Sequence, residues 1–196
     1  GFLNVDSFDG FQFDLQNPNR IALEGDRFRY NFNLYADVLS GFAQGQFKYN
    51  KVDFYASASV TNTQYQREGL YQNGAYEDNS LGKGEKLSFT GIATKAGLTY
   101  KLTGKHLFDI NAAYITRAPS LRNTYSNSRE NHNIVSDITE EKVSSVDASY
   151  IFRSSIVKAK LTGYFTKIED ANEISFFYAD GIGGDNTAFV QEILQG

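Results

Sequence analysis

Apolar and polar residues alternate along many short segments of this chain, and that alternation restricts the fold more than any other feature. In residues 52–62 the even positions from Val52 to Val60 are apolar, whereas Asp53 and Ser57 stand among the odd ones. The same period of two recurs in residues 108–114, 146–152 and 157–165, and more loosely in 39–49 and 87–101. Such alternation is typical of strands with one apolar face. We therefore expect an all-β, antiparallel, up-and-down fold.

The connections between these segments are of two kinds, short and long, which alternate along the chain. Tight turns are predicted at residues 49–51, 102–105 and 153–155. Long polar spans are predicted at residues 64–86, 117–141 and 169–186, with the first 27 residues as a further loop. Long loops are unusual in a compact soluble domain but typical of one side of an outer-membrane barrel. We expect a transmembrane β-barrel segment of about six or seven strands, with long extracellular loops and short periplasmic turns.

The composition of the chain argues against several other classes of protein. No run approaches the ~20 apolar residues of a transmembrane helix, and barrel strands need no such run. The net charge of −4 gives no basic footprint for nucleic acid. The absence of Cys removes disulfides and thiolate metal sites. Because the chain has no Met and no signal peptide, and residues 189–194 read as a strand without a closing turn, we expect a truncated or partly observed chain.

The two faces of the predicted strands differ in character. Charged and amide side chains share the face opposite the lipid, which suits a wide, wet or plugged lumen: Asp53, Lys95, Asp109, Asn111, Asp147, Lys158 and Lys160. Ala148 and Leu161 are expected on the lipid face near the midplane, with Ser149 and Thr162 on the lumen face. Interfacial girdles are predicted from Tyr49, Tyr55, Tyr65, Tyr100, Tyr114, Tyr150 and Tyr164, although tyrosine also simply favours strands.

Catalytic patterns are weak. His106 and His132 fall in a turn and in a loop, so we expect them on opposite sides of the membrane, without metal-ligand spacing. Residues 181–185 are glycine-rich but read as a flexible loop rather than a nucleotide loop, and residues 180–186 lack the oxygen spacing of a calcium loop. The paired carboxylates at 140–141 and 169–170 lie at strand–loop borders, where solvated charge is usual. We expect no enzymatic activity, no metal and no cofactor.

The long loops combine arginine with tyrosine. Arginine recognises carboxylate or phosphate through paired hydrogen bonds, and tyrosine stacks on sugars or apolar groups. The candidates for contact with a ligand are Arg67, Tyr71, Tyr76, Arg117, Arg122, Tyr125 and Arg129. The alternative is that these residues only solvate the loops of an outer-membrane protein.

One stretch resembles a known family. Arg117-Ala118-Pro119-Ser120-Leu121-Arg122, followed by Tyr125, is similar to the Arg-Ala-Pro corner of TonB-dependent outer-membrane receptors. In that family an Asn-Pro-Asp-Leu-x-Pro-Glu motif follows, and here Asp137, Ile138 and Glu141 match it, whereas its Asn and both Pro are replaced. Residues 62–69, 82–89, 97–102 and 176–181 are similar to the Bacteroidetes branch of these receptors.

The resemblance implies a barrel of about 22 strands, plugged by an N-terminal domain, that imports scarce nutrients with energy from the inner-membrane TonB complex. Residues 1–196 would form part of that one barrel domain, without the plug and the C-terminal strands. The implied partners are outer-membrane lipid, TonB acting through the absent plug, an unknown nutrient and a surface lipoprotein, with no nucleic acid. Polysaccharide fragments, peptides, siderophores and cobalamin all remain candidate substrates. Two alternatives stay open: a non-transporting barrel or adhesin, and a soluble β-sandwich binding module.

Overall fold

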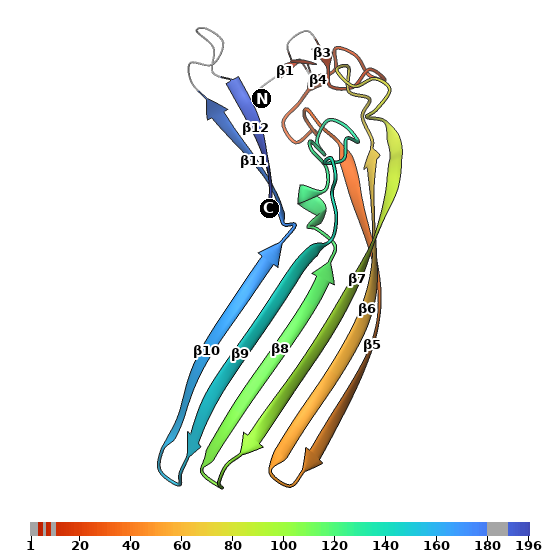
Figure 1. Ribbon diagram of the computed structural model, residues 1–196. Coiled ribbons are helices and arrows are strands. Elements are labelled where there is room, and N and C mark those ends of the chain that lie inside the picture. The colour runs from red at the N-terminus through yellow and green to blue at the C-terminus, as the bar shows by residue number, and fades with distance from the viewer. Residues whose placement is uncertain (1–3, 6, 9–10, 180–187) are drawn as a thin grey trace.

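A computed structural model describes residues 4–5, 7–8, 11–179 and 188–196. Its main element is one six-stranded sheet of β5 (Phe32–Tyr49), β6 (Val52–Gly69), β7 (Gly82–Lys101), β8 (His106–Arg117), β9 (Glu141–Arg153) and β10 (Lys158–Glu169). Every strand pairs antiparallel with its neighbour in sequence, in the order β10-β9-β8-β7-β6-β5. Figure 1 shows the resulting up-and-down meander of long, tilted strands, as the alternation predicts.

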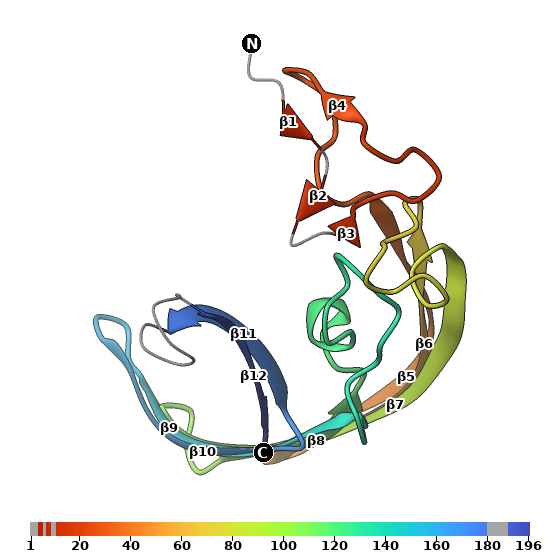
Figure 2. The same cartoon turned by 90° about the horizontal axis from the view of Figure 1, so that it is seen from above.

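The sheet is curved into an arc, so it has a concave and a convex face (Figure 2). It is part of a barrel wall and is not closed, because β5 and β10 are edges in the described chain. No second sheet covers the convex face within the described residues, and large apolar side chains such as Leu161 and Val60 stay exposed there. A β-sandwich would bury that face against another sheet. The described residues therefore do not form the β-sandwich of that alternative.

All three tight turns lie at one end of the sheet, which we call the turn end. Asn50 adopts a left-handed conformation, with φ of 49°, between β5 and β6, as short hairpin turns require. Backbone bonds close the other two turns, from Leu102 N to His106 O at 3.0 Å and from Ser154 N to Val157 O at 2.8 Å. The opposite end, which we call the loop end, carries the long connections. The predicted asymmetry of loop lengths is confirmed.

Two of the predicted loops are partly strands. Residues 64–69 and 82–86 continue β6 and β7, so the loop between them is only 70–81. Alternation fails to reveal this extension because its convex side carries polar residues such as Gln64, Gln66 and Lys86. A strand that rises above the apolar band faces water on its outer side and no longer shows an apolar stripe. The predicted loop at 117–141 is confirmed, with the connection running through residues 118–140.

The predicted loop at 169–186 contains a hairpin. β11 (Asn172–Ala179) pairs with β12 (Ala188–Gln195), apart from the main sheet, after a left-handed residue at Asp170. The expected strand at 189–194 is confirmed as part of β12. The glycine-rich 181–185 segment and the weak calcium candidate at 180–186 lie outside the described residues. In the described part of the N-terminal loop, two-residue strands pair: β1 (Asn4–Val5) with β4 (Ile21–Ala22), and β2 (Ser7–Phe8) with β3 (Phe11–Gln12).

Tyrosines lie on both faces of the sheet. Tyr100, Phe108, Tyr150 and Leu161 stand opposite one another in one convex row near the turn end. Tyr49 precedes the adjacent turn, and Tyr114 shares the convex parity. The girdle expectation is wrong for three residues on the concave face: Tyr55, Tyr65 and Tyr164. Their side chains find polar surroundings there, since Tyr55 Oη donates to Asn111 Oδ1 at 3.2 Å and Tyr164 stands opposite Asp147.

The concave face is polar, as predicted. Lys101 Nζ pairs with Asp53 Oδ1 at 2.6 Å, and Thr99 Oγ1 donates to Asp109 Oδ1 at 2.7 Å. Asn111 Nδ2 donates to Asp109 and Asp147 at 3.2 and 3.0 Å. Because these groups bond to one another across four strands, the wall can present charge to the interior at little cost.

Candidate functional site

The β6–β7 loop (70–81) and the β8–β9 loop (118–140) fold over the concave side at the loop end (Figure 2). The N-terminal segment packs on the first of them. Leu15 N donates to Gln72 O, and Gly74 N donates to Gln12 O, both at 2.8 Å. Three segments distant in sequence therefore meet in one assembly at the loop end.

A single arginine joins the two long loops. Arg67 Nε donates to Ser128 O at 2.7 Å, and its Nη1 donates to Ser80 O at 2.9 Å. The same Nη1 lies 2.9 Å from His132 Nδ1. Only 1% of Arg67 is exposed. We call Arg67, Ser80, Ser128 and His132 the clasp.

The clasp determines the tautomer of its histidine. A guanidinium only donates, so His132 Nδ1 must accept and the ring proton sits on Nε2, which faces Leu81 O at 3.4 Å. Burial lowers the pKa of His132, and the positive charge of Arg67 lowers it further. The contacts of the clasp therefore favour the neutral form of the His132 ring.

Two glycines allow the clasp to close. A Cβ on Gly69 would lie 1.7 Å from Ser80 O, and a Cβ on Gly84 would lie 2.7 Å from His132 Nδ1. Any larger residue at Gly69 must displace the backbone of the β6–β7 loop. Close approach of the Ser80 backbone explains Gly69, and close approach of the His132 side chain explains Gly84.

The Arg-Ala-Pro corner is held from both of its sides. Arg117, the last residue of β8, stands opposite Glu141, and its Nε donates to Glu141 Oε2 at 2.9 Å. Tyr65 Oη donates to the carbonyl of buried Pro119 at 3.0 Å. Ser120 then caps the short helix η1 (Leu121–Asn123) by accepting from Asn123 N. Two residues of the sequence motif, Arg117 and Glu141, are thus brought together as an ion pair.

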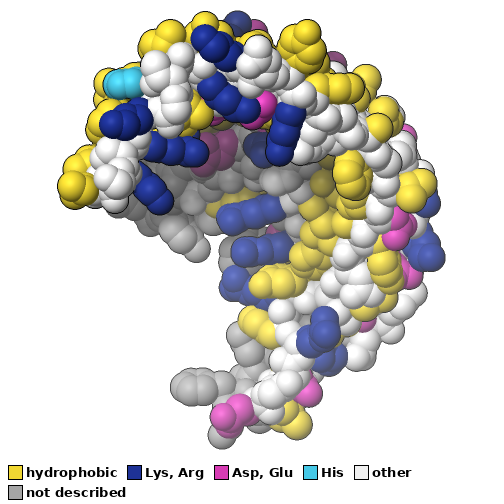
Figure 3. Space-filling model, turned by 90° about the horizontal axis from the view of Figure 1, so that it is seen from below, with side chains coloured by type: hydrophobic (Ala, Val, Ile, Leu, Met, Phe, Trp, Pro, Cys, Tyr) yellow, Lys and Arg dark blue, Asp and Glu magenta, His cyan; other side chains and the backbone are white. Residues whose placement is uncertain are grey.

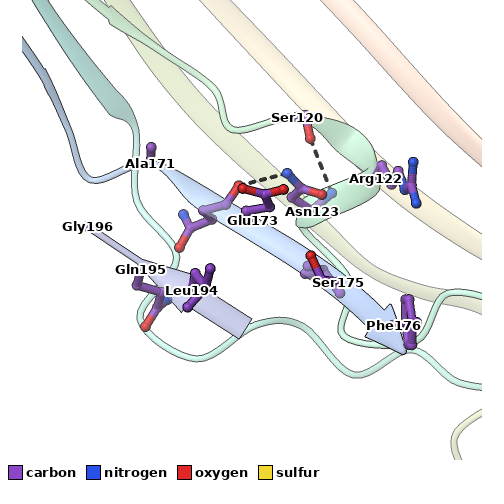
Figure 4. Close-up of a pocket in the computed structure, with 12 residues that line it drawn as sticks. Ser120, Arg122, Asn123, Ala171, Glu173, Ser175, Phe176, Leu194, Gln195 and Gly196 are labelled. Carbon is purple, nitrogen blue, oxygen red and sulfur yellow. Dashed lines mark hydrogen bonds between the residues drawn. The ribbon is translucent and has the colours of Figure 1, made fainter. Parts of the chain in front are cut away.

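An open groove lies between η1 and the β11–β12 hairpin (Figure 4). Its volume is about 770 Å³, within the range of small-molecule sites. Asn123 Nδ2 donates to Asn172 O at 2.7 Å, which ties the helix to the hairpin. Five hydroxyl or amide side chains line the groove beside apolar Ala171, Ile174 and Leu194, together with exposed Arg122, Glu173 and Phe176. The groove offers one cationic, one acidic and one aromatic side chain among neutral hydrogen-bonding and aliphatic groups.

The other candidate residues lie in different parts of the assembly. The ring of half-buried Tyr71 stacks under Arg20, 5.4 Å from Cζ to centroid, and Arg129 lies 5.3 Å from the Tyr30 centroid. Half-buried Tyr76 takes part in a backbone turn, donating from its N–H to Asn73 O. Of the seven candidates, Arg122 lines the groove.

Two candidates lie beneath the surface. Tyr125 is 2% exposed, forms a bridge with Ile134, and burial raises its pKa. Arg67 is the centre of the clasp. In this arrangement both side chains contact the loops and are shielded from solvent. In the second half of the family motif, Asp137 is exposed with a left-handed φ of 54°, and Ile138 is half-buried.

Sequence reasoning missed the hairpin side of the groove. Asn172, Glu173 and Phe176 were not candidates because their segment reads as a loop. Ile174, Phe176 and Tyr178 alternate with Glu173 and Ser175, and that signal predicts a strand. Ser80 and Ser128 contribute backbone carbonyls to the clasp, which no side-chain pattern reveals.

The two histidines lie at opposite ends of the sheet, as predicted. His106 at the turn end contacts Tyr150 Oη at 2.6 Å, whereas His132 belongs to the clasp at the loop end. Within the described residues no three His, Asp or Glu side chains gather as a metal site would require. No helix among the described residues has the length and apolar character needed to cross a membrane.

Comparison with protein families gives one result that spans the chain. A family model described as "TonB dependent receptor-like, beta-barrel" matches residues 2–193. Comparison with curated proteins and with solved structures gave no match. The match covers the whole six-stranded sheet, both loops of the clasp and nearly all of the β11–β12 hairpin.

Proposed function

This chain belongs to the TonB-dependent receptor β-barrel family, a family of outer-membrane receptors and transporters. From that premise we propose that it forms part of the wall and mouth of a receptor. The receptor binds a scarce nutrient at the cell surface and imports it actively. The closer kinship to the Bacteroidetes branch, which rests on sequence motifs, is part of this proposal. The loop end would then face outward and the turn end would face the periplasm.

The groove at the loop end is the observation that carries the proposal. It is concave, has a volume of about 770 Å³, and is bordered by η1 and the hairpin on the hollow side of the sheet. Arg122 offers paired donors to a carboxylate or phosphate, and Phe176 offers an apolar surface. Amide and hydroxyl groups supply directional bonds to a polar ligand. Capture here needs no covalent step.

Import adds two partners to the proposal. Energy would come from the inner-membrane TonB complex, acting through a plug domain outside this chain, and a surface lipoprotein could cover the loop end. Outer-membrane lipid would surround the convex face, whose exposed apolar side chains support that placement. The polar concave wall supports passage of a hydrophilic solute.

Binding and uptake by the full-length protein in outer membranes test the proposal. Labelled polysaccharide fragments, peptides, siderophores and cobalamin are offered to cells with and without a protonophore. Active import predicts that surface binding survives the protonophore and that accumulation does not. Accumulation that ignores the protonophore would overturn active import. Binding without accumulation in energised cells would favour the non-transporting barrel.

The groove is tested by Arg122→Ala. Losing a charged hydrogen-bond donor is worth about 1.5–3 kcal/mol, so the Kd of the imported ligand should rise by about 10- to 150-fold. Lys86→Ala is the matched control, because Lys86 is also an exposed cation at the loop end but lies on the convex side. An equal rise in Kd for the two variants would show that the groove is not the binding site.

A further inference from the structure

The hairpin that borders the groove has one edge that no other described strand covers, because β11 pairs with β12 alone. Ala171 N donates to Gly196 O at 2.6 Å, and Gly196 N donates to Ala171 O at 3.1 Å, so these residues form a hydrogen-bonded pair. Such pairs alternate with non-hydrogen-bonded pairs along an antiparallel hairpin. The backbone N–H and C=O groups of Asn172 and Ile174 therefore point away from β12. We call this side of Asn172 and Ile174 the open edge of β11.

The open edge faces the groove. Asn123 Nδ2 of η1 donates to Asn172 O at 2.7 Å, which places that carbonyl on the side away from β12. Asn172 and Ile174 line the groove, and so do Glu173 and Ser175 between and beyond them. Successive side chains of a strand point to opposite faces. Because residues of both parities line it, the groove follows the edge of β11 rather than one face, as Figure 4 shows beside η1.

The open edge has hydrogen-bonding capacity that the described chain does not use. Ile174 is 6% exposed and Asn172 is 7% exposed. No loop or turn hydrogen bond in the described part of the chain uses the N–H or C=O of Ile174. Buried backbone groups are nearly always paired in folded proteins. An occupant of the groove that carries its own N–H and C=O groups would complete this pairing.

We propose that the groove binds a short peptide in an extended conformation, which adds a strand to the open edge of β11. This inference rests on the proposed function, because it names the substrate class of the same groove. An extended peptide presents N–H and C=O groups along one edge at the spacing of a β-ladder, so both groups of Ile174 gain partners. A neutral oligosaccharide presents hydroxyl groups without that repeat.

The charges of the groove also suit a peptide. Arg122 and Glu173 are its charged lining residues, and neither forms a salt bridge with another described residue. A peptide with free termini carries one positive and one negative end near pH 7. Positive side chains gather instead at the turn end, where Figure 3 shows Lys and Arg around the hollow of the sheet. The groove itself therefore favours a ligand of balanced charge.

Backbone N-methylation of a bound peptide tests strand addition on the purified full-length receptor. A synthetic mixture of pentapeptides with free termini is offered, and mass spectrometry identifies those that bind. The tightest is resynthesised as a series with one N-methyl group each, and calorimetry measures every Kd. N-methylation removes one N–H and adds bulk at that edge without changing a side chain. We expect the Kd to rise by about tenfold or more at the residue opposite Ile174 and to change little at its two neighbours.

A substitution in the receptor provides a second, independent measurement. Ile174→Pro removes the N–H that points into the groove and leaves the hydrogen bonds to β12 in place, and edge strands tolerate proline at such positions. Ile174→Ala is the matched control, because it shortens the same side chain and keeps the N–H. The Kd of the selected pentapeptide should be about tenfold higher for Ile174→Pro than for Ile174→Ala. Folded receptor is quantified for both variants, and if Ile174→Pro does not assemble, the N-methyl series on the unchanged receptor decides.

Three results overturn the proposal. The first is an N-methyl series in which the Kd changes equally at every residue. The second is an equal Kd for assembled Ile174→Pro and Ile174→Ala. The third is the absence of any bound pentapeptide. If a neutral oligosaccharide then binds and Arg122→Ala weakens it, the peptide class is wrong while nutrient capture in the groove stands. If no probe binds and energised cells accumulate none, the proposed function fails as well.

Discussion

Replacing Ala112 by arginine should place a charge in the middle of the apolar band on the convex face. Ala112 stands in one cross-strand row with Ala56, Ala96, Val146 and Phe165. A charged residue at the midplane of the lipid face of a barrel costs ~2–4 kcal/mol. That cost corresponds to a loss of roughly 30- to 1,000-fold in the folding equilibrium.

The adjacent residue is the matched control. Ala113 faces the concave side, opposite Lys95 and Ser145. Arginine there stays in contact with water. Its cost is the repulsion from Lys95 on the neighbouring strand, worth ~0.2–1 kcal/mol. The same substitution one residue along the chain should therefore differ by ~1–4 kcal/mol in its effect on assembly.

Depth along the strand adds a second comparison. Leu161 lies in the row of Tyr150 and Tyr100, near the turn end, rather than near the midplane that its sequence pattern predicts. Its replacement by arginine should cost only ~0–1 kcal/mol, as at an interface. Thr162 is the better concave control for Leu161, because Ser149 is only 4% exposed and a larger residue there would collide.

The assay is the amount of full-length protein that reaches the outer membrane in a heat-modifiable, folded form. We expect a strong loss of folded protein for Ala112→Arg and a partial loss for Ala148→Arg. The yield of folded protein should be near normal for Leu161→Arg, Thr162→Arg and Ala113→Arg. Equal yields for Ala112→Arg and Ala113→Arg would refute the assignment of faces. Equal loss at Ala112 and Leu161 would refute the assignment of depth.

The loop end allows three further predictions. Gly69→Ala should destabilise the loops by about 1–3 kcal/mol, because its Cβ meets loop backbone at 1.7 Å, and faster limited proteolysis at residues 70–81 would report it. The pKa of His132 is lowered in the folded state, so the clasp contributes stability above pH ~6.5 that is lost as the pH falls through the folded pKa. Loop proteolysis should accelerate in acid, and His132→Gln should flatten that dependence; a flat wild-type profile contradicts the sign. Arg117→Ala should cost about 1–3 kcal/mol, because it leaves the Glu141 carboxylate, whose side chain is only 10% exposed, without its cation. Glu141→Ala should cost less, because Arg117 is 61% exposed and can be solvated without its partner; equal urea midpoints would contradict this.

Strands within the apolar band could be predicted because each presents one lipid-facing and one wet face. Val52 to Val60 and Phe108 to Tyr114 carry that contrast in their sequence. Above the band both faces of β6 are polar, from Gln64 and Gln66 outside to Arg67 inside, and the contrast vanishes. The strand continues there because its backbone still pairs in the ladder, and backbone pairing leaves no mark on side-chain composition.

The candidate site could be predicted only in part, for a related reason. Arg122 is recognisable as an exposed loop arginine and does line the groove. Arg67 looks the same in the sequence, yet it is buried because three acceptors from two loops converge on it. Two of those acceptors are carbonyl oxygens of serines, so the sequence carries no information about them. Whether an arginine contacts ligand or loops depends on tertiary contacts that local patterns do not contain.

Separate surfaces of the same sheet therefore meet separate physical demands. Period-two alternation assigns adjacent residues, such as Ala112 and Ala113, to lipid and to the interior. Position along the strand then divides the interior into two ends. At the loop end, buried hydrogen bonds such as those of Arg67 fix the loops around an open groove. At the turn end, Arg153 and Lys158 face each other without an ion-paired carboxylate among the described residues. The alternation that separates lipid from interior therefore does not separate the two ends of the interior, which differ in how their charged side chains are paired.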